Sequence, residues 1–298
     1  MHPVIIEAAI NGITTKERNP HVPQLPAEIT ADALRCLGAG AAIVHNHIDL
    51  LTADPPAAAA RYVEAWRPVI GARPDALFYP TVGFGGGIEQ RFGHIPLLAA
   101  TGLLRLSLLD PGSVNLGAMD ADGLPGGTFD FVYANSFSDI RHAIALCAQC
   151  CLGPSIAIYE PGFLRTTLAY ARAGRLPAGA FVKFYFGGDH DYLSGAAGGV
   201  SFGLPPTPAA LDVYLSMLGD CGLPWAVAVL GGDVVGCGMA RAALERGGHV
   251  RVGLEDYAGP RRPTNAELVG EAATLAAEVG RPVATCRDAA GMLGLSPD

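Results

Sequence analysis

The stretch Ala41-Ala42-Ile43-Val44-His45-Asn46-His47 joins an apolar run to two histidines. In a β-strand, residues i and i+2 point to the same face, so a strand that ends here directs both imidazoles to one point. Far along the chain, Arg251-Val252-Gly253-Leu254-Glu255-Asp256 ends a second apolar run in two carboxylates. Two histidines and one carboxylate are typical of a catalytic zinc that keeps one coordination position open. We therefore predict a metal site of His45, His47 and one of these two carboxylates, Glu255 or Asp256.

Apolar runs typical of strands recur along the chain and alternate with helical stretches. The strand-like runs are 4–10, 41–47, 76–82, 103–108, 155–159, 181–186, 225–230 and 250–254. Helical patterns between them include 26–39, 55–69, 138–151, 207–221 and 239–246. Alternating strands and helices predict a parallel sheet. Eight such units in about 250 residues favour a (β/α)8 TIM barrel over a doubly wound sheet, and we expect residues 1–298 to form one barrel domain.

Two segments stand outside this repeat. A ninth strand-like run, 129–134, is assigned to the long loop after the fourth strand. The tail after Asp256 predicts one more amphipathic helix at 265–279, a short strand-like run at 282–285 and a last helical turn.

In a TIM barrel, catalytic side chains lie at the C-terminal ends of the strands. Four predicted strands end in reactive side chains: the second in His45 and His47, the third in Thr81, the fourth in Ser107 and the eighth in Glu255 and Asp256. Arg251 shares strand parity with Glu255, and a buried arginine needs a carboxylate partner. Asp256 has the opposite parity, so the chain has to turn at Glu255 for both carboxylates to enter the site. A structural salt bridge inside the barrel is the alternative interpretation of these charges.

Composition limits the partners. Half of the 298 residues are hydrophobic, and the net charge of -8 argues against a nucleic-acid or anionic membrane surface, although a few local arginines can still hold a small anion. We see no signal peptide and no apolar run of about 18 residues. Seven cysteines, an odd number scattered through the chain, suggest free thiols in a reducing compartment. We therefore expect a cytoplasmic protein.

Several motifs resemble those of the β-keto acid cleavage enzymes. They are Ala8-Ala9-Ile10-Asn11-Gly12, Asn19-Pro20 with Pro23, 39–47, Gly112-Ser113-Val114-Asn115, 247–256 and Gly280-Arg281-Pro282-Val283-Ala284-Thr285. The similarity runs from about residue 4 to residue 295. It implies a zinc-bearing (β/α)8 barrel, usually a homotetramer, that condenses a β-keto acid with acetyl-CoA to give acetoacetate and the CoA ester of the remaining acyl part.

The resemblance also implies roles for single residues. These are the metal ligands His45, His47 and Glu255, the group Asp256 that initiates the chemistry together with Arg251, and the hydroxyl residues Thr81 and Ser107 that bind the substrate carboxylate. The chemistry is consistent with these roles, because zinc can polarise the keto oxygen and a base whose pKa is tuned by a nearby cation can activate the keto acid.

Two positions depart from the pattern of the 3-keto-5-aminohexanoate cleavage enzymes. Thr14 and Ser136 stand where those enzymes have acids that suit an amino-bearing substrate. We expect both to contact a different acyl tail. Arg105 shares strand parity with Ser107, so it is expected to face the same pocket; the alternative is that it pairs with a barrel carboxylate and never meets substrate. A pocket with a cation and no acid predicts a neutral or anionic acyl tail, because a buried ammonium would be left unpaired.

Other functions remain open on the sequence alone. A metal-dependent hydrolase or a class II aldolase-type lyase could use the same barrel, but amidohydrolases carry their His-x-His on the first strand and here it ends the second. A non-catalytic metal-binding or ligand-binding barrel is the other alternative, although it has no need of the second carboxylate, Asp256. Iron(II) or another divalent metal accepts the same ligands as zinc.

Overall fold

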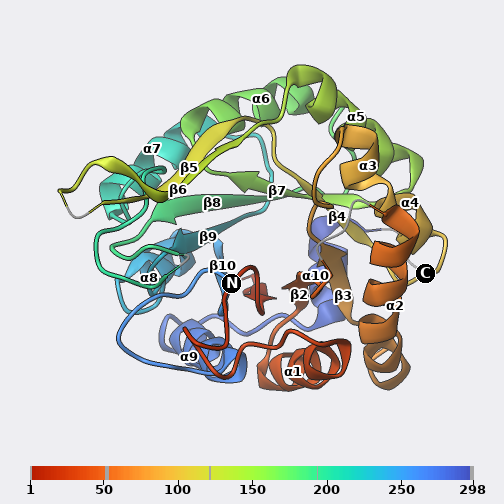
Figure 1. Ribbon diagram of the computed structural model, residues 1–298, viewed down its shortest axis with the longest axis horizontal. Helices are drawn as coiled ribbons and strands as arrows, with labels where there is room; N and C mark the ends of the chain where they lie inside the picture. Colours follow the sequence, from red (N-terminus) through yellow and green to blue (C-terminus); the bar gives the residue numbers. More distant parts are fainter. Residues whose placement is uncertain (1, 51–53, 121, 193, 296–298) are drawn as a thin grey trace.

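Eight parallel strands form the wall of a barrel in the computed structural model, which describes residues 2–50, 54–120, 122–192 and 194–295 (Figure 1). The strands are β1 (Ile6–Ala9), β2 (Ile43–Asn46), β3 (Leu77–Pro80), β4 (Leu106–Leu109), β7 (Gly153–Ile158), β8 (Phe181–Gly187), β9 (Trp225–Leu230) and β10 (His249–Val252). Their order is β3-β2-β1-β10-β9-β8-β7-β4, and the end strands β3 and β4 lie beside each other. This arrangement confirms the predicted (β/α)8 TIM barrel.

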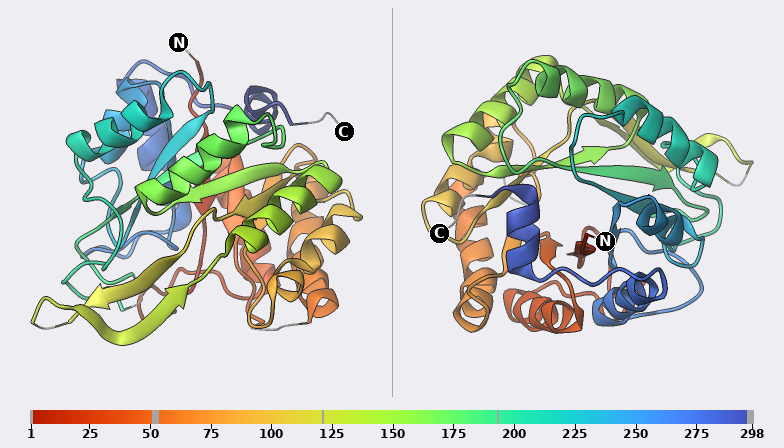
Figure 2. Two further views of the ribbon diagram at one scale, coloured as in Figure 1. Left: turned by 90° about the horizontal axis from the view of Figure 1, so that it is seen from above. Right: turned by 180° about the vertical axis from the view of Figure 1, so that it is seen from behind.

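The helices form an outer ring around these strands (Figure 2). They are α1 (Pro26–Ala39), α2 (Pro55–Ala72), α3 (Ile88–Phe92), α4 (His94–Ala99), α5 (Phe137–Gln149), α6 (Pro161–Arg172), α7 (Pro208–Leu218), α8 (Met239–Glu245) and α9 (Asn265–Glu278). The last helix, α10 (Cys286–Leu293), lies inside this ring, at the end of the barrel where the chain starts. Local sequence sets their first turns. Thr207, Thr264 and Thr285 each accept a hydrogen bond from a backbone N–H of the first turn, which satisfies a donor that has no partner within the helix.

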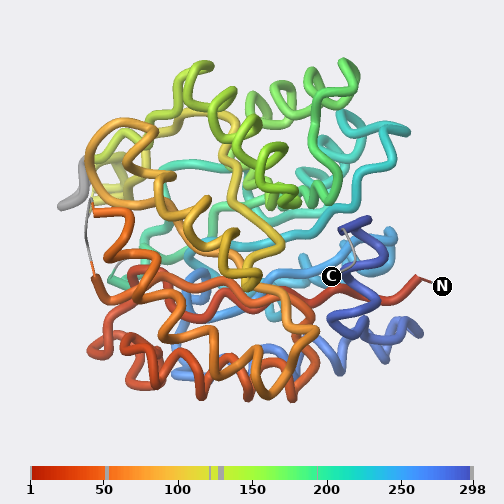
Figure 3. The backbone as a smooth tube through the Cα atoms, turned by 90° about the vertical axis from the view of Figure 1, so that its right-hand side faces the viewer, coloured from red at the N-terminus to blue at the C-terminus, as the bar shows by residue number. Residues whose placement is uncertain are grey.

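The run expected as loop at 129–134 is largely a strand. Within the long connection after β4, β5 (Val114–Met119) and β6 (Pro125–Tyr133) pair as an antiparallel hairpin. Each strand's hydrogen-bonding partner is the other strand of the hairpin, so the repeat that identifies barrel strands cannot identify them. The hairpin projects from the end of the barrel opposite the start of the chain (Figure 3). It therefore lies at the rim where the parallel strands end.

The second expected strand-like run, at 282–285, makes a single parallel bridge between Val283 and Val4. This bridge attaches the segment before α10 to the chain just ahead of β1, at the N-terminal end of the barrel. Among the described residues, no helix is long and apolar enough to cross a bilayer.

The two faces of the barrel strands differ in chemistry. The outward faces pack apolar side chains against the helices, as with Trp66 of α2 stacked on Phe78 of β3. The interior instead holds Glu7, Lys183 and Arg251, each at most 2% exposed. Charges buried in this way have to satisfy one another. They form the floor beneath the site at the C-terminal rim.

Candidate metal and substrate site

His45 and His47 from the end of β2 meet Glu255 from the turn after β10. His45 Nε2 lies 3.3 Å from Glu255 Oε2, and His47 Nε2 lies 3.6 Å from Glu255 Oε1. One ligand atom from each residue lies within 4.8 Å of the others, and the part of the chain that is described holds no other such group of three or more. Four ligands placed tetrahedrally at about 2.1 Å are about 3.4 Å apart. The spacing therefore fits one zinc-sized cation.

The imidazole of His45 is held in the orientation that a metal ligand needs. Its Nδ1 lies 3.1 Å from the carbonyl oxygen of Tyr79, and its ring stacks on the Tyr79 ring at 4.3 Å. A proton on Nδ1 leaves the lone pair of Nε2 directed at Glu255. Burial lowers the pKa of His45 to about 3, so the ring is neutral at physiological pH, which is the form that binds metals.

The segment directly after β1 supports this site through Asn11 and Gly12. The backbone N–H of His47 donates to Asn11 Oδ1 at 2.8 Å, and Asn11 Nδ2 donates to the carbonyl oxygen of His47 at 3.1 Å. Gly12 has a φ of +54°, and a Cβ there would lie 2.4 Å from the Cγ of Glu255. Only glycine satisfies both the backbone conformation and the close approach of Glu255.

Glu255 provides an independent test of whether a cation fits. Its Oε2 is buried and has no hydrogen-bond partner among the described residues. Burial would raise the pKa of Glu255, but Arg251 and the two histidines hold it well below the usual value, so the carboxylate is ionised. A buried, ionised oxygen without a donor is costly, and a bound cation removes that cost. These residues therefore fit a metal ion with nitrogen and oxygen ligands.

Both carboxylates after β10 reach Arg251. Arg251 Nε lies 2.7 Å from Asp256 Oδ2, and Arg251 Nη2 lies 3.0 Å from Glu255 Oε1. The turn that allows this falls at Gly253, two residues before the expected position at Glu255. Gly253 has a φ of +135°, and a Cβ there would lie 2.0 Å from the carbonyl oxygen of Ala9. Burial raises the pKa of Asp256 to about 6, against the opposing effect of Arg251.

Beneath the site, Arg251 belongs to a network with a second buried cation, Lys183. Glu7 Oε1 accepts from Arg251 Nη1 at 2.8 Å and lies 3.3 Å from Lys183 Nζ. Lys183 Nζ also donates to the hydroxyls of Tyr79 at 2.5 Å and Ser155 at 2.6 Å. Burial would raise the pKa of Glu7, but Lys183 and Arg251 hold it below the usual value. The network fixes the position of Arg251 from below.

A small cavity lies between this network and the metal cluster. Its lining includes His45, Tyr79, Thr81, Leu108, Asp110, Ser155, Ala157, Tyr159, Lys183, Tyr185, Arg251 and Glu255. Asp110 follows β4, and its Oδ2 accepts a hydrogen bond from the hydroxyl of Tyr133 on the hairpin strand β6. Burial raises the pKa of Asp110. The hairpin therefore contacts a lining residue of the cavity, Asp110, through Tyr133.

The structure brings Thr81 to this cavity, whereas Ser107 points elsewhere. Thr81 follows β3 and lines the cavity. Along β4 the side chains alternate, so Leu108 and Asp110 face the cavity while Ser107 faces Cys147 on α5. The predicted contact between Ser107 and substrate stays a prediction, and the geometry favours Asp110 as the polar residue that β4 presents.

Thr14, Ser136 and Arg105 are also absent from the lining of the cavity. Thr14 donates to the carbonyl oxygen of Leu254 at 2.7 Å and ties the loop after β1 to the turn after β10. Ser136 caps the N-terminus of α5. Arg105 directly precedes β4 and so lies at the far end of that strand from the rim. Their contact with substrate, and the acyl-tail preference argued from them, stay predictions.

Five residues that line the cavity or contact its lining were not among the predicted site residues: Glu7, Tyr79, Asp110, Tyr133 and Lys183. A signal existed for two of them. Glu7 interrupts the apolar run Val4-Ile5-Ile6-Glu7-Ala8-Ala9-Ile10, and Lys183 interrupts Phe181-Val182-Lys183-Phe184-Tyr185-Phe186. A lone charge in a buried strand needs a buried counter-charge, so the two interruptions together predict a pair inside the barrel.

Comparison with known proteins identifies a family that this chain matches. A family model described as beta-keto acid cleavage enzyme matches residues 3–295. A 3-keto-5-aminohexanoate cleavage enzyme of Acetoanaerobium sticklandii is 28% identical over 301 residues, which cover 99% of this chain and 100% of that protein. A 3-oxoadipate:acetyl-CoA acetyltransferase of Cupriavidus necator is 27% identical over 300 residues, which cover 98% of this chain and 95% of that protein.

Solved structures show the same fold. The apo structure of ObcA superposes with a TM-score of 0.70 at 15% identity, over 93% of this chain and 66% of that longer chain. The match to the family model extends over almost the whole sequence, and the relatives it resembles are named as enzymes. The alternative of a non-catalytic barrel is thereby set aside, and the chain belongs to the beta-keto acid cleavage enzyme family.

Proposed function

We propose that this protein is a zinc-dependent enzyme that condenses a β-keto acid with acetyl-CoA to give acetoacetate and an acyl-CoA. The observation that carries the proposal is the convergence of His45, His47 and Glu255 beside the buried pair of Arg251 and Asp256. A metal site and a tuned carboxylate are what this condensation needs. The names of the relatives support acetyl-CoA as the second substrate, since it appears in the names of a 3-oxoadipate:acetyl-CoA acetyltransferase and a 3-dehydrocarnitine:acetyl-CoA trimethylamine transferase.

The geometry supports the proposed roles of the metal and of the hydroxyl at the rim. When bound, zinc would act as a Lewis acid toward the keto and carboxylate oxygens of the substrate. Thr81 lines the same cavity, and its hydroxyl has no hydrogen-bond partner among the described residues, so it can donate to the substrate carboxylate.

Asp256 is the base in this proposal. A carboxylate with a pKa of about 6 is ionised at neutral pH and is a stronger base than an exposed aspartate. Arg251 holds it through two nitrogen–oxygen contacts, which fix the orientation of the carboxylate. Asp256 accepts a proton from the carbon between the keto and carboxylate groups, and that carbon attacks the thioester carbonyl of acetyl-CoA and displaces the CoA thiolate. The thiolate then attacks the keto carbon and breaks its bond to the former nucleophilic carbon, which leaves as acetoacetate after taking back the proton from Asp256, while the acyl-CoA forms. No cysteine nucleophile is required.

Location and assembly are proposed on separate grounds. All seven cysteines are free in the structure, which supports a reducing compartment such as the cytoplasm. A homotetramer is proposed from the family resemblance. Light scattering of the purified protein measures the assembly directly, and a monomer would contradict it.

A substrate panel tests the proposed reaction. Purified protein with zinc is mixed with acetyl-CoA and each of several β-keto acids carrying amino, neutral or carboxylate tails. Acetoacetate and the matching acyl-CoA should form together, in equal amounts, with at least one member of the panel. Release of acetate and free CoA instead would indicate a hydrolase and contradict the proposal.

A further inference from the structure

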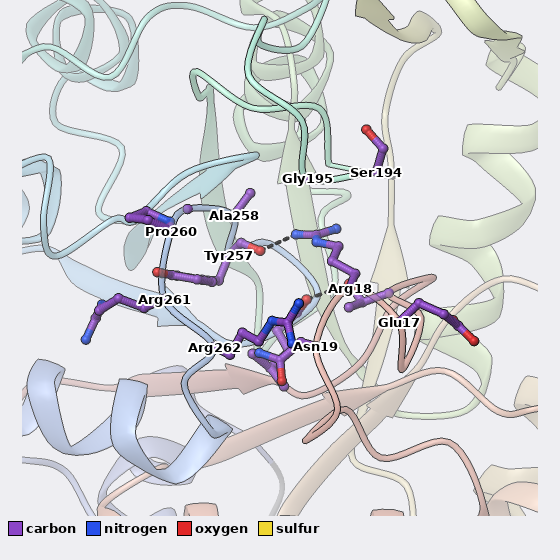
Figure 4. Close-up of a pocket in the computed structure, with 13 residues that line it drawn as sticks. Glu17, Arg18, Asn19, Ser194, Gly195, Tyr257, Ala258, Pro260, Arg261 and Arg262 are labelled. Atoms are coloured by element: carbon purple, nitrogen blue, oxygen red, sulfur yellow. Dashed lines mark hydrogen bonds between the residues drawn. The ribbon is translucent and has the colours of Figure 1, made fainter.

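A second hollow opens on the same rim, beside the turn that carries Glu255 and Asp256. Its volume is about 310 Å³. Loops that follow β1, β8 and β10 line it, and Figure 4 shows the arginines that they contribute (Figure 4). The residues used below are Arg18 from the first loop and Arg262 from the third, and we call this hollow the Arg18–Arg262 pocket.

Arg18 reaches into this pocket with a guanidinium that contacts only neutral groups. Its Nη1 donates to the carbonyl oxygen of Tyr192 and its Nη2 donates to that of Tyr257. Burial lowers the pKa of Arg18, and Asp191 and Asp256 oppose that shift from a distance. No carboxylate of the described residues forms an ion pair with it. Arg18 therefore keeps a charge that an arriving anion can contact.

Arg262 is the second available cation. It is exposed, and within the described ranges it makes no hydrogen bond or ion pair. Its neighbour Arg261 differs, because it is paired with Glu271 at 2.6 Å and with Asp233 at 3.0 Å. In Figure 4 the side chains of Arg261 and of the acidic Glu17 point away from the centre, toward which Arg18 is directed. The centre of the pocket is therefore cationic on a protein whose net charge is -8.

We propose that the Arg18–Arg262 pocket binds a phosphate group of the CoA thioester. This inference rests on the proposed function and assigns the CoA end of the substrate to a place in the structure. A planar guanidinium matches phosphate oxygens in a forked, charge-assisted geometry. A local cationic hollow on an acidic protein also concentrates anions at that point of the surface.

The location of the pocket fits a substrate that bridges it and the metal cluster. Tyr257, whose carbonyl oxygen binds Arg18, follows Asp256 directly in the chain. An anion held by Arg18 is therefore tied to the same turn that carries the base. The phosphates of a CoA thioester are joined to the reacting carbonyl by a long flexible arm, so the two ends can occupy neighbouring hollows on one rim.

The test compares full and truncated thioesters in Arg262→Met. The parent enzyme should have a higher kcat/KM with acetyl-CoA than with acetyl-pantetheine, which lacks the phosphates. In Arg262→Met this preference should fall about tenfold, as expected for the loss of one charge-assisted contact of about 1.5 kcal/mol. Arg287→Met on α10 is the matched control, because it removes an exposed arginine from the opposite end of the barrel, and its preference should equal that of the parent.

A binding measurement separates this inference from the proposed reaction. Calorimetry with coenzyme A reports the pocket whether or not turnover occurs, and the affinity of Arg262→Met should fall about tenfold relative to Arg287→Met, with Arg262→Glu weaker still. If acetyl-CoA supports turnover but the two methionine variants bind coenzyme A equally, the pocket assignment is wrong and the reaction stands. If no β-keto acid is cleaved but Arg262→Met still loses affinity, the reaction is wrong and the phosphate site stands.

Discussion

Arg251 and Asp256 form a two-point ion pair inside the barrel, with Nε 2.7 Å from Oδ2 and Nη2 3.2 Å from Oδ1. Both side chains are at most 4% exposed. The same guanidinium also contacts Glu255 at 3.0 Å, so one arginine positions a proposed metal ligand and the proposed base. Because the proposed metal ligand and the proposed base are different residues, a mutation of one can be expected to leave the function of the other in place.

Replacing the base should leave the metal in place. Asp256→Asn keeps the shape of the side chain and leaves His45, His47 and Glu255 unchanged, so metal content measured by plasma mass spectrometry should equal that of the parent. Turnover should fall on the order of 10²-fold or more, which is typical for loss of a general base. Asp212→Asn, at an exposed position of α7, is the control. Parent-level turnover in Asp256→Asn would show that Asp256 is not the base.

The turn at Gly253 is predicted to be intolerant of any side chain. Gly253→Ala places a Cβ against the carbonyl oxygen of Ala9 and forces alanine into a φ of +135°. We expect lower thermal stability together with reduced metal content, because Glu255 moves with the turn. Gly270→Ala in α9 is the control, because nothing lies within 4 Å of its added Cβ and alanine favours a helix. Equal metal content in the two variants would show that metal binding does not depend on the turn at Gly253.

The buried cations predict a large stability effect at Glu7. Glu7→Gln removes the carboxylate that contacts both Lys183 and Arg251. Leaving buried charges without their partner costs about 3–5 kcal/mol, so the free energy of unfolding in urea should fall by about that amount. Adding Lys183→Met to Glu7→Gln should recover part of the loss. A change below about 1 kcal/mol would mean that water or an anion replaces the carboxylate.

Two buried histidines outside the metal cluster predict acid sensitivity. Burial lowers the pKa of His94 to about 4 and that of His249 to about 3, from an ordinary value of 6.5. Above pH 6.5 both rings are neutral in the folded and unfolded chains, so they add no pH dependence. Below it the unfolded chain takes up the protons first, and the free energy of unfolding falls as the pH drops.

The size of this effect is set by linkage. Each ring should contribute about 1.4 kcal/mol per pH unit between its two pKa values. Urea melts of the parent and of His249→Gln between pH 7 and pH 5 measure it, and the slope should be smaller in the variant. An identical slope in the two proteins would contradict a neutral, buried His249.

The barrel could be predicted from the sequence because its signal is a repeat. Eight apolar runs separated by helices identify the strands, and the same logic places His45 and Glu255 on one rim. The hairpin could not be found this way, because β5 and β6 pair with each other outside the repeat. Asp110, which lines the cavity just after β4, was not among the predicted site residues, and the contact of Ser107 with substrate stays a prediction.

The interior network was missed for a different reason. Glu7 and Lys183 are 176 positions apart in the chain, so each is visible in the sequence only as a lone charge in an apolar run. Only the closed barrel brings their strands to opposite walls of one interior. The turn at Gly253 is a similar case, because strand alternation alone gives Glu255 and Asp256 opposite faces.

Metal removal and restoration provide the most direct test of a zinc-dependent cleavage enzyme. Acetoacetate formation from acetyl-CoA and a β-keto acid is measured before chelation, after chelation and after adding back one equivalent of zinc per chain. Formation should vanish in the metal-free protein and return with zinc, and it should not return in His45→Ala treated the same way. Undiminished acetoacetate formation by metal-free protein would contradict the proposed role of His45, His47 and Glu255.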